Sequence, residues 1–228
     1  MNHRLSVVVP VYRNEATLVE LHRRLSATLG ALDISGYEVI FVDDASPDGS
    51  WTIIETLASA DPHVVGLRLR SNVGQLRALC AGLEVARGDV LATMDADLEH
   101  PPESIPDLVR TFEDGHELVI ARRIGHSSER LRVIGSMAFN LLARLLRMPT
   151  IGVGSSFLVG SPQVGTEVRR IVERTGRQLI LPTVYDLAHD PTVIDIELSA
   201  TAESSYTLQG VLRLGGEFLA TELGPRLA

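Results

Sequence analysis

Cysteine, lysine and long apolar runs are scarce or absent in this sequence. One cysteine among 228 residues excludes a scaffold held together by disulfides and indicates a reducing compartment. The longest apolar stretch, residues 133–146, is interrupted by Asn140 and Arg144 and is shorter than the roughly 18 uninterrupted residues of a membrane-spanning helix. The chain also enters a strand-like segment directly after Arg4, without the apolar region of a signal peptide. We therefore expect a cytoplasmic protein with no membrane span.

Basic charge is limited and comes from arginine alone. Lysine is absent, and 21 arginines against 29 acidic residues give a net charge of −8. This balance disfavours nucleic-acid binding, which generally requires a net basic surface. Six arginines nevertheless stand between residues 121 and 150 beside a single acid, Glu129; they are Arg122, Arg123, Arg130, Arg132, Arg144 and Arg147. The sequence therefore predicts a local basic region in an acidic protein.

Apolar patterning predicts alternating strands and helices over the first half of the chain. With 45% hydrophobic residues, the chain can bury a large core. Apolar or β-branched segments typical of strands occupy residues 5–11, 37–42, 63–69, 90–94 and 117–121. Apolar residues at helical spacing occupy residues 16–32, 50–60, 75–87 and 102–114. We expect an α/β fold with a doubly wound, mostly parallel sheet, in which ligands lie at the carboxyl ends of the strands.

The second half of the chain is less regular. Its patterns predict a long helix over residues 129–147, a Gly-Ser stretch over 152–156, a helix over 164–175 and an amphipathic helix over 207–223. The length is that of one ordinary domain, so we expect a single domain over residues 1–228.

Two carboxylates follow the apolar segment at residues 90–94. Asp95 and Asp97 emerge from the carboxyl end of the predicted strand on the same side of the pleat, so both can meet one cation. Hard oxygen ligands with open coordination positions suit Mg²⁺ or Mn²⁺, and Glu99 could extend the set. The alternative is a solvated turn before the helix that begins at Pro102.

A third carboxylate, Asp43, closes the segment at residues 37–42. The turn that follows it caps the next helix, which accounts for Asp48 but leaves Asp43 unexplained. A carboxylate at this kind of strand end commonly accepts hydrogen bonds from a nucleoside. We therefore interpret Asp43 as a nucleotide-binding residue.

Several segments, taken together and in order, carry a resemblance to a known family. They are residues 7–12 (VVVPVY) with Glu15, 41–50 (FVDDASPDGS), 72–75 (NVGQ), 86–89 (ARGD) and 95–103 (DADLEHPPE). The chain resembles family 2 glycosyltransferases, and within them the polyprenyl-phosphate branch of dolichyl-phosphate mannose synthases and undecaprenyl-phosphate sugar transferases. This resemblance implies a GT-A fold, a UDP- or GDP-sugar donor, a divalent metal, Mg²⁺ or Mn²⁺, and inversion at the anomeric carbon.

The resemblance also implies roles for individual residues. Residues 1–125 would form the nucleotide-sugar-binding half and residues 126–228 the acceptor-binding half with the terminal helix. The nucleoside would lie against Pro10, Tyr12, Glu15 and Asp43. The ribose, diphosphate and metal would lie against Asp95 and Asp97, the expected catalytic carboxylates, with Glu99 adding a charge where the family often has glutamine. Acceptor phosphate would bind to Arg122, Arg123, Arg132 and Ser136.

The chain departs from this branch in its second half. The usual Gly-Asp pair after the long helix reads Gly154-Ser155-Ser156 here, and serine replaces lysine in the segment at residues 204–207. The C-terminal membrane helices of many relatives have no counterpart. A polyprenyl phosphate attacks without deprotonation, whereas a hydroxyl acceptor needs a base, for which Asp186, His189 and Asp190 are candidates.

These departures leave three hypotheses open. We favour a metal-dependent inverting glycosyltransferase that acts on a hydroxyl of a soluble small-molecule acceptor, with Asp186 as a candidate base. The first alternative is a polyprenyl-phosphate glycosyltransferase, peripheral at the inner face of the membrane and working with a membrane partner. The second alternative is a non-catalytic subunit that binds nucleotide sugars. A homo-oligomer is compatible with each.

Overall fold

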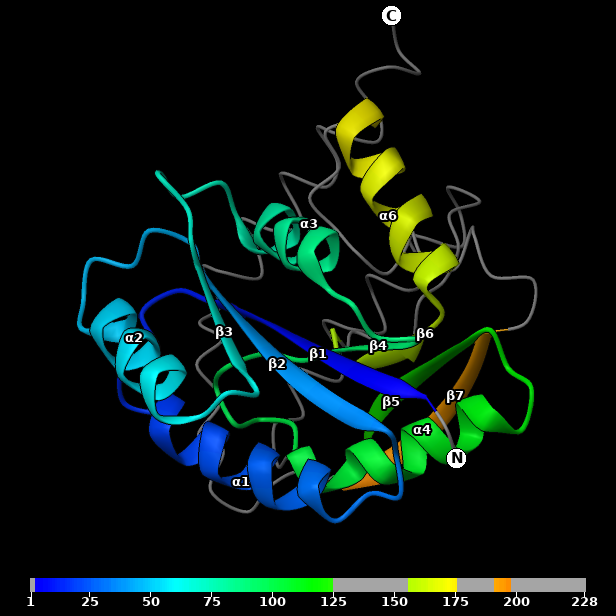
Figure 1. Cartoon of the computed structure of the whole chain (residues 1–228). Coiled ribbons are helices and arrows are strands. Elements are labelled where there is room, and N and C mark those ends of the chain that lie inside the picture. Colours follow the sequence, from blue (N-terminus) through cyan, green and yellow to red (C-terminus); the bar gives the residue numbers. More distant parts are fainter. Residues whose placement is uncertain (1–2, 125–155, 176–190, 198–228) are drawn as a thin grey trace, which may run out of the picture.

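Seven strands form one sheet through the centre of the molecule, with helices on both faces (Figure 1). The structure is a computed structural model that describes residues 3–124, 156–175 and 191–197. In this part of the chain the strand order is β3-β2-β1-β4-β6-β5-β7. Neighbours among β1 to β4 are parallel, β6 runs antiparallel to β4 and β5, and β7 is parallel to β5. The expected doubly wound, mostly parallel sheet is confirmed.

Strands and helices alternate along the first half of the chain. The strands are β1 Arg4–Val11, β2 Gly36–Asp43, β3 Val64–Arg68, β4 Val90–Thr93, β5 Leu118–Ile124, β6 Leu158–Gly160 and β7 Pro191–Glu197. The helices are α1 Leu18–Gly30, α2 Ser50–Ala60, α3 Gln75–Val85, α4 Ile105–Glu113 and α6 Pro162–Thr175, with the 3₁₀ helix η1 Pro102–Ser104 before α4. None of these described helices is both long and apolar enough to cross a membrane.

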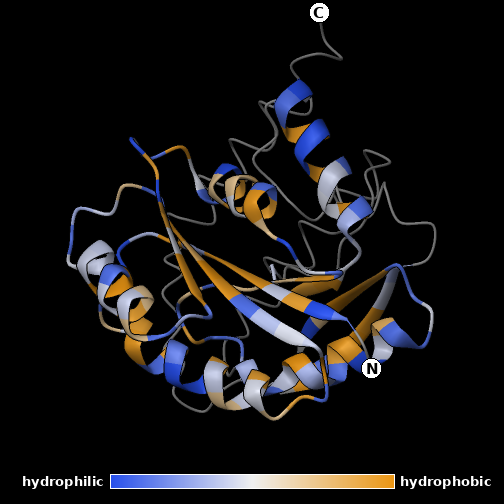
Figure 2. Ribbon diagram, in the orientation of Figure 1, coloured by the Kyte–Doolittle hydropathy of each residue, from blue (hydrophilic) through white to orange (hydrophobic). Residues whose placement is uncertain are grey.

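The side chains of β1 alternate between two apolar layers. Val7 and Val9 belong to the core that α1 and α4 cover, whereas Val8 packs with residues of α3 and α6 on the opposite face. In Figure 2 the central strands are apolar along most of their length, while the helices have many hydrophilic residues. Burial on both faces explains why the central strands are continuous apolar runs in the sequence.

The strands and helices expected between residues 5 and 121 are all present, with ends shifted by a few residues. The structure adds two strands that the sequence did not predict. β6 has only three residues, and β7 begins at Pro191, directly after a segment in which we expected candidate bases for the acceptor. The helices expected over residues 129–147 and 207–223 lie outside the described residues.

The segment at residues 86–89 serves the fold and lies at the amino ends of the strands. Glu38 of β2 is buried, and its Oε1 accepts hydrogen bonds from the Ser6 hydroxyl and the Arg87 N–H, both at 2.7 Å. The Gly88 N–H in turn donates to Ser6 Oγ at 2.7 Å, and a Cβ at Gly88 would lie 2.6 Å from the Ser6 nitrogen. This segment therefore links β1 and β2 at the amino ends of the strands, far from their carboxyl ends.

Asp44 fixes the start of α3 against the end of β2. Its carboxylate is 2% exposed and accepts hydrogen bonds from the N–H groups of Val73 at 2.7 Å and Gly74 at 2.9 Å. Gly74 has a φ of 89°, which a residue with a Cβ rarely adopts, and it directly precedes α3. The loop that leads to α3 is thus tied to the sheet by one buried side chain.

Replacing Asp44→Asn should lower the free energy of unfolding by about 1–3 kcal/mol, because the amide leaves one part-buried N–H without an acceptor beside a buried side chain. Urea denaturation measures the change. Asp114→Asn, at an exposed position after α4, is the matched control and should unfold like the unmodified protein. Equal stability of the two variants would contradict this role of Asp44.

Gly82 lets α3 approach the sheet. A Cβ at this position would lie 2.3 Å from Val8 Cγ1 and 2.8 Å from Val42 Cγ2. Gly82→Ala should therefore destabilise the fold by about 1–3 kcal/mol through overpacking. Gly30→Ala, at the end of α1, meets no atom within 4 Å and should leave the fold as stable or more stable in the same thermal or urea unfolding experiment.

Candidate functional site

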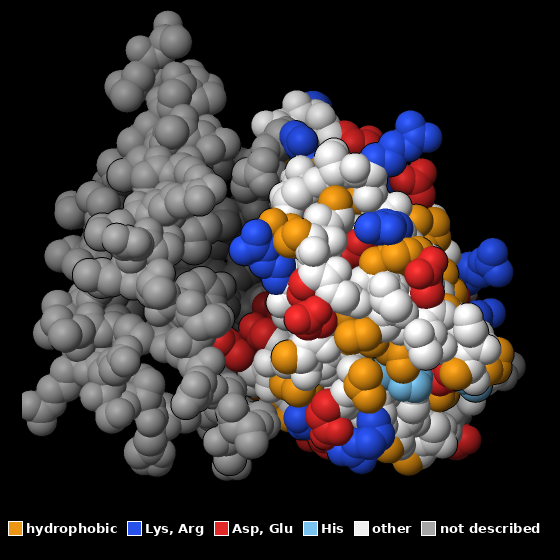
Figure 3. Space-filling model, turned by 90° about the vertical axis from the view of Figure 1, so that its left-hand side faces the viewer, with side chains coloured by type: hydrophobic (Ala, Val, Ile, Leu, Met, Phe, Trp, Pro, Cys, Tyr) orange, Lys and Arg blue, Asp and Glu red, His pale blue; other side chains and the backbone are white. Residues whose placement is uncertain are grey.

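The strand order reverses between β1 and β4. β2 and β3 lie on one side of β1, and β4 lies on the other. Such a switch point in a parallel sheet leaves a crevice outside the carboxyl ends of the strands, where ligands bind. The loops at this edge are residues 12–17, 44–49 and 94–101. Figure 3 faces the side toward which β1 and β2 run, and there several acidic side chains gather with arginine side chains nearby.

Backbone strain concentrates in the same loops. Arg13, Ala45 and Leu98 have φ angles of 61°, 55° and 63°, in the left-handed region that residues with a side chain rarely adopt. They are the non-glycine residues with positive φ in the described part of the chain, and each lies in a different one of the three loops. Because such strain clusters at functional sites, it supports this location independently of the sequence motifs.

The loops after β1 and β2 are tied to each other. Oε2 of Glu15 accepts a hydrogen bond from the Gly49 N–H at 2.6 Å. Burial by itself would raise the pKa of Asp48, but hydrogen bonds from Ser50 and from the Glu15 backbone lower the pKa of this carboxyl below its usual range. Glu15, predicted to bind the nucleoside, therefore holds the loops after β1 and β2 together.

Asp43 is completely buried at the end of β2. Its Oδ1 accepts a hydrogen bond from the Ser46 N–H at 3.2 Å. Its Oδ2 has no hydrogen-bond donor among the described residues and lies 3.5 Å from Nε of Arg68, whose guanidinium lies over the Trp51 ring. A buried carboxylate oxygen without a donor is costly, so a ligand N–H or O–H here would stabilise the site.

Pro10 and Tyr12 differ in their access to a ligand. Pro10 is buried within β1, where it pairs with Val42. Tyr12 follows the strand and is 43% exposed, with the guanidinium of Arg13 5.3 Å from its ring centroid. Of Pro10 and Tyr12, only Tyr12 therefore has a side chain that is accessible from solvent.

The Asp95 carboxylate is held from two directions. Its Oδ1 accepts a hydrogen bond from the Gln75 side-chain amide at the start of α3, and its Oδ2 accepts one from the Ser156 hydroxyl at 2.5 Å. Asp97 accepts a hydrogen bond from the Glu99 N–H at 2.9 Å. Gln75 and Ser156 were not among the predicted site residues, although Gln75 stands in the matched segment at residues 72–75.

The three predicted metal ligands are not gathered around one point. Among residues 3–124, 156–175 and 191–197, no three His, Cys, Asp or Glu side chains are grouped as they would be around a metal ion. Glu99 is buried at 6% exposure, whereas Asp95 and Asp97 are half-buried. Two carboxylates still suit Mg²⁺ or Mn²⁺, because these ions bind through one or two carboxylates when a substrate diphosphate supplies further oxygens.

Arg122, predicted to bind acceptor phosphate, already pairs with a carboxylate. Its Nε and a terminal nitrogen donate to the two Asp195 oxygens of β7 at 2.5 and 2.9 Å. The hydrogen bonds from Arg122 lower the pKa of Asp195 below its usual range. Arg123 belongs to the same strand, β5, and Arg132, Ser136 and Asp186 lie outside the described residues.

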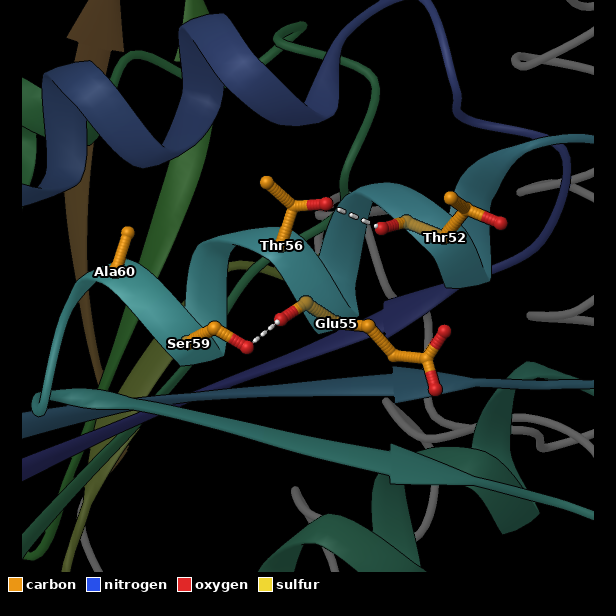
Figure 4. A pocket seen from close by; sticks show the side chains of 5 residues that line it. All are labelled: Thr52, Glu55, Thr56, Ser59 and Ala60. Atoms are coloured by element: carbon orange, nitrogen blue, oxygen red, sulfur yellow. Dashed lines mark hydrogen bonds between the residues drawn. The ribbon is translucent and has the colours of Figure 1, made fainter.

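A shallow depression on α2 is a less suitable site. It is lined by Thr52, Glu55, Thr56, Ser59 and Ala60 (Figure 4). The Thr56 and Ser59 hydroxyls donate to the carbonyl oxygens of Thr52 and Glu55 in their own helix, at 2.9 and 2.8 Å. These hydroxyls are thus occupied by the helix backbone rather than directed toward a ligand.

Comparison with known proteins shows that the chain is similar to glycosyltransferases over longer stretches than the motifs alone. The family model described as glycosyl transferase family 2 matches residues 6–165. The undecaprenyl-phosphate 4-deoxy-4-formamido-L-arabinose transferase of Shewanella sediminis (strain HAW-EB3) is 46% identical over 143 residues, and that of Proteus mirabilis (strain HI4320) is 40% identical over 141. Each alignment covers 61% of this chain but only 42% and 43% of those proteins, so the chain spans less than half of their length.

Solved structures share the fold at low sequence identity. Glucosyl-3-phosphoglycerate synthase from Mycobacterium tuberculosis, in complex with Mn²⁺ and UDP-glucose, has a TM-score of 0.65 and 23% identity over 97% of this chain and 78% of that one. TarS of S. aureus in complex with UDP has a TM-score of 0.61 and 22% identity over 86% of this chain and 61% of that one. At this level of identity the likeness confirms the expected GT-A type of α/β fold.

The family match includes each of the three loops at the switch point. The strained backbone, the buried Asp43 and the Asp95 and Asp97 carboxylates all lie within residues 6–165. The resemblance drawn from the sequence motifs is therefore confirmed, and the chain belongs to glycosyl transferase family 2.

Proposed function

We propose that this chain transfers a sugar, with inversion, from a UDP-sugar to the phosphate of a polyprenyl phosphate. The observation that carries the proposal is the placement of Asp43, Asp95 and Asp97 at the switch point of a family 2 fold. The choice of acceptor follows the relatives that are 46% and 40% identical, whose names specify undecaprenyl phosphate. The donor nucleotide follows the structural neighbours, which were solved with UDP or UDP-glucose.

On the donor side, Asp43 has a different task from that of Asp95 and Asp97. Asp43 accepts a hydrogen bond from the nucleoside through its buried Oδ2, while Tyr12 lies at the open side of the pocket. Asp95 and Asp97 would hold Mg²⁺ or Mn²⁺, and the donor diphosphate would supply further oxygens to the ion. When bound, the metal supplies positive charge that offsets the charge growing on the departing UDP.

On the acceptor side, the phosphate needs no general base. Its oxygen is already anionic at neutral pH, so it attacks the anomeric carbon as the bond from that carbon to UDP breaks on the opposite face. Cationic groups hold such an acceptor, and the arginines between residues 121 and 150 are suited to this task. In this mechanism Asp186 has no role as a base.

The proposal also divides the chain by function. Residues 1–125 bind the donor, residues 126–228 bind the acceptor, and the chain works at the inner membrane face.

Transfer to a hydroxyl of a soluble acceptor, which we ranked first from sequence alone, becomes the second candidate. The comparisons give more support to the lipid phosphate, because the named relatives are polyprenyl-phosphate transferases. One observation still favours a hydroxyl acceptor. Arg122 is already engaged by both oxygens of Asp195, so a phosphate would have to displace a bidentate carboxylate.

The test compares two acceptors that differ only in the phosphate. The purified chain is incubated in detergent with Mn²⁺, a panel of radiolabelled UDP-sugars and either undecaprenyl phosphate or undecaprenol. We expect label in the lipid phase with undecaprenyl phosphate alone. Asp97→Asn should lower the rate at least a hundredfold, because the metal ion beside the diphosphate would lose a carboxylate ligand. Asp107→Asn on the exposed face of α4 should leave the rate unchanged.

Each remaining outcome points to another function. Label in undecaprenol, or only in water-soluble hydroxyl compounds, would contradict the phosphate acceptor and support the second candidate. UDP binding without transfer to any acceptor and without slow donor hydrolysis would instead indicate a non-catalytic subunit.

A further inference from the structure

Asp95 is oriented by two residues that are distant from it in the sequence. Gln75 at the first position of α3 donates its side-chain amide to Oδ1. Ser156, just before β6, donates its hydroxyl to Oδ2 at 2.5 Å. The two donors come from different elements and approach different oxygens, so they fix the rotation of the carboxylate as well as its position.

The backbone of Ser156 is itself held against β4. The Thr93 hydroxyl donates to the Ser156 carbonyl oxygen at 2.5 Å, and Thr93 is 2% exposed. Antiparallel pairing of Thr93 with Leu158 continues this contact along β6, which lies next to β4 in the sheet (Figure 1). The backbone of Ser156 is therefore anchored to the strand that precedes Asp95, and from this fixed position its hydroxyl holds the Asp95 carboxylate.

The hydrogen bonds from Gln75 and Ser156 bear on the metal site because the resemblance implies that Asp95 binds the metal. Donors of this kind around a ligating carboxylate determine its direction and contribute strongly to metal affinity. The hydrogen bonds from Gln75 and Ser156 therefore bear on how Asp95 would hold a cation.

We propose that Ser156 and Gln75 are positioning residues that orient Asp95 toward the metal and the donor diphosphate. This inference rests on the proposed function. It also gives a role to Ser156, which the sequence analysis noted only as part of a segment that lacks the family's usual acid. The Ser156 hydroxyl can donate a hydrogen bond to Asp95, which an ionised acid at this position could not do.

Calorimetric titration with UDP, with and without Mn²⁺, tests the assignment. In Ser156→Ala we expect about a tenfold rise in the dissociation constant of UDP when Mn²⁺ is present, because Asp95 loses an orienting donor, and no change without Mn²⁺. Ser156→Thr keeps a hydroxyl and should restore most of the Mn²⁺-dependent affinity. Ser59→Ala, which removes a hydroxyl bonded to its own helix on α2, is the matched control and should bind like the unmodified protein.

Gln75→Leu provides a second variant at an exposed position, in case Ser156→Ala does not fold. It should show the same loss confined to Mn²⁺-dependent binding. Full Mn²⁺-dependent affinity in both Ser156→Ala and Gln75→Leu, or an equal loss with and without Mn²⁺, would overturn the positioning role and leave the proposed function intact. An unmodified protein that does not bind UDP would overturn the proposed function itself, and this inference with it.

Discussion

The structure depends on hydrogen bonds to the carboxylates that follow the strands at one end of the sheet, of which Asp43 and Asp44 are buried and Asp95 is half-buried. An ionised carboxylate in this position needs donors, since burial without them costs several kcal/mol. The loops provide these donors, because backbone N–H groups of the loop before α3 bind Asp44 and side chains of α3 and the β6 entry bind Asp95. The same contacts hold the loops in place, so carboxylates at the candidate site also contribute to the fold.

The first half of the fold could be predicted because its signals are local. Central strands buried on both faces read as apolar runs, and helices between them show helical spacing, so β1 to β5 were found with small errors at their ends. β6 and β7 could not be found in this way. β6 has three residues, too few to show a periodic pattern of apolar side chains. Both strands are defined by partners in β4 and β5 that are far away in the sequence.

The position of the candidate site at the ends of β2 and β4 could be expected from the sequence, but its internal contacts could not. Asp43, Asp95 and Asp97 were recognised from strand ends, and the structure places them at the switch point. The hydrogen bond from Ser156 to Asp95 spans 61 positions, so no local pattern indicates it. Not every segment that carries the resemblance belongs to the candidate site, because the segment at residues 86–89 lies at the opposite end of the sheet around Glu38. A matched motif thus mixes residues that serve the fold with residues that serve the ligand.

The central claim is that a nucleotide diphosphate binds across the loops after β1, β2 and β4. Hydrogen exchange of the full chain, with and without UDP and Mn²⁺, tests it most directly, because it reports on each loop separately. The account predicts slower exchange in residues 12–17, 44–49 and 94–101, with no change in the α2 face at residues 52–60. Protection confined to α2, or tight UDP binding that leaves all three loops exchanging as before, would contradict it.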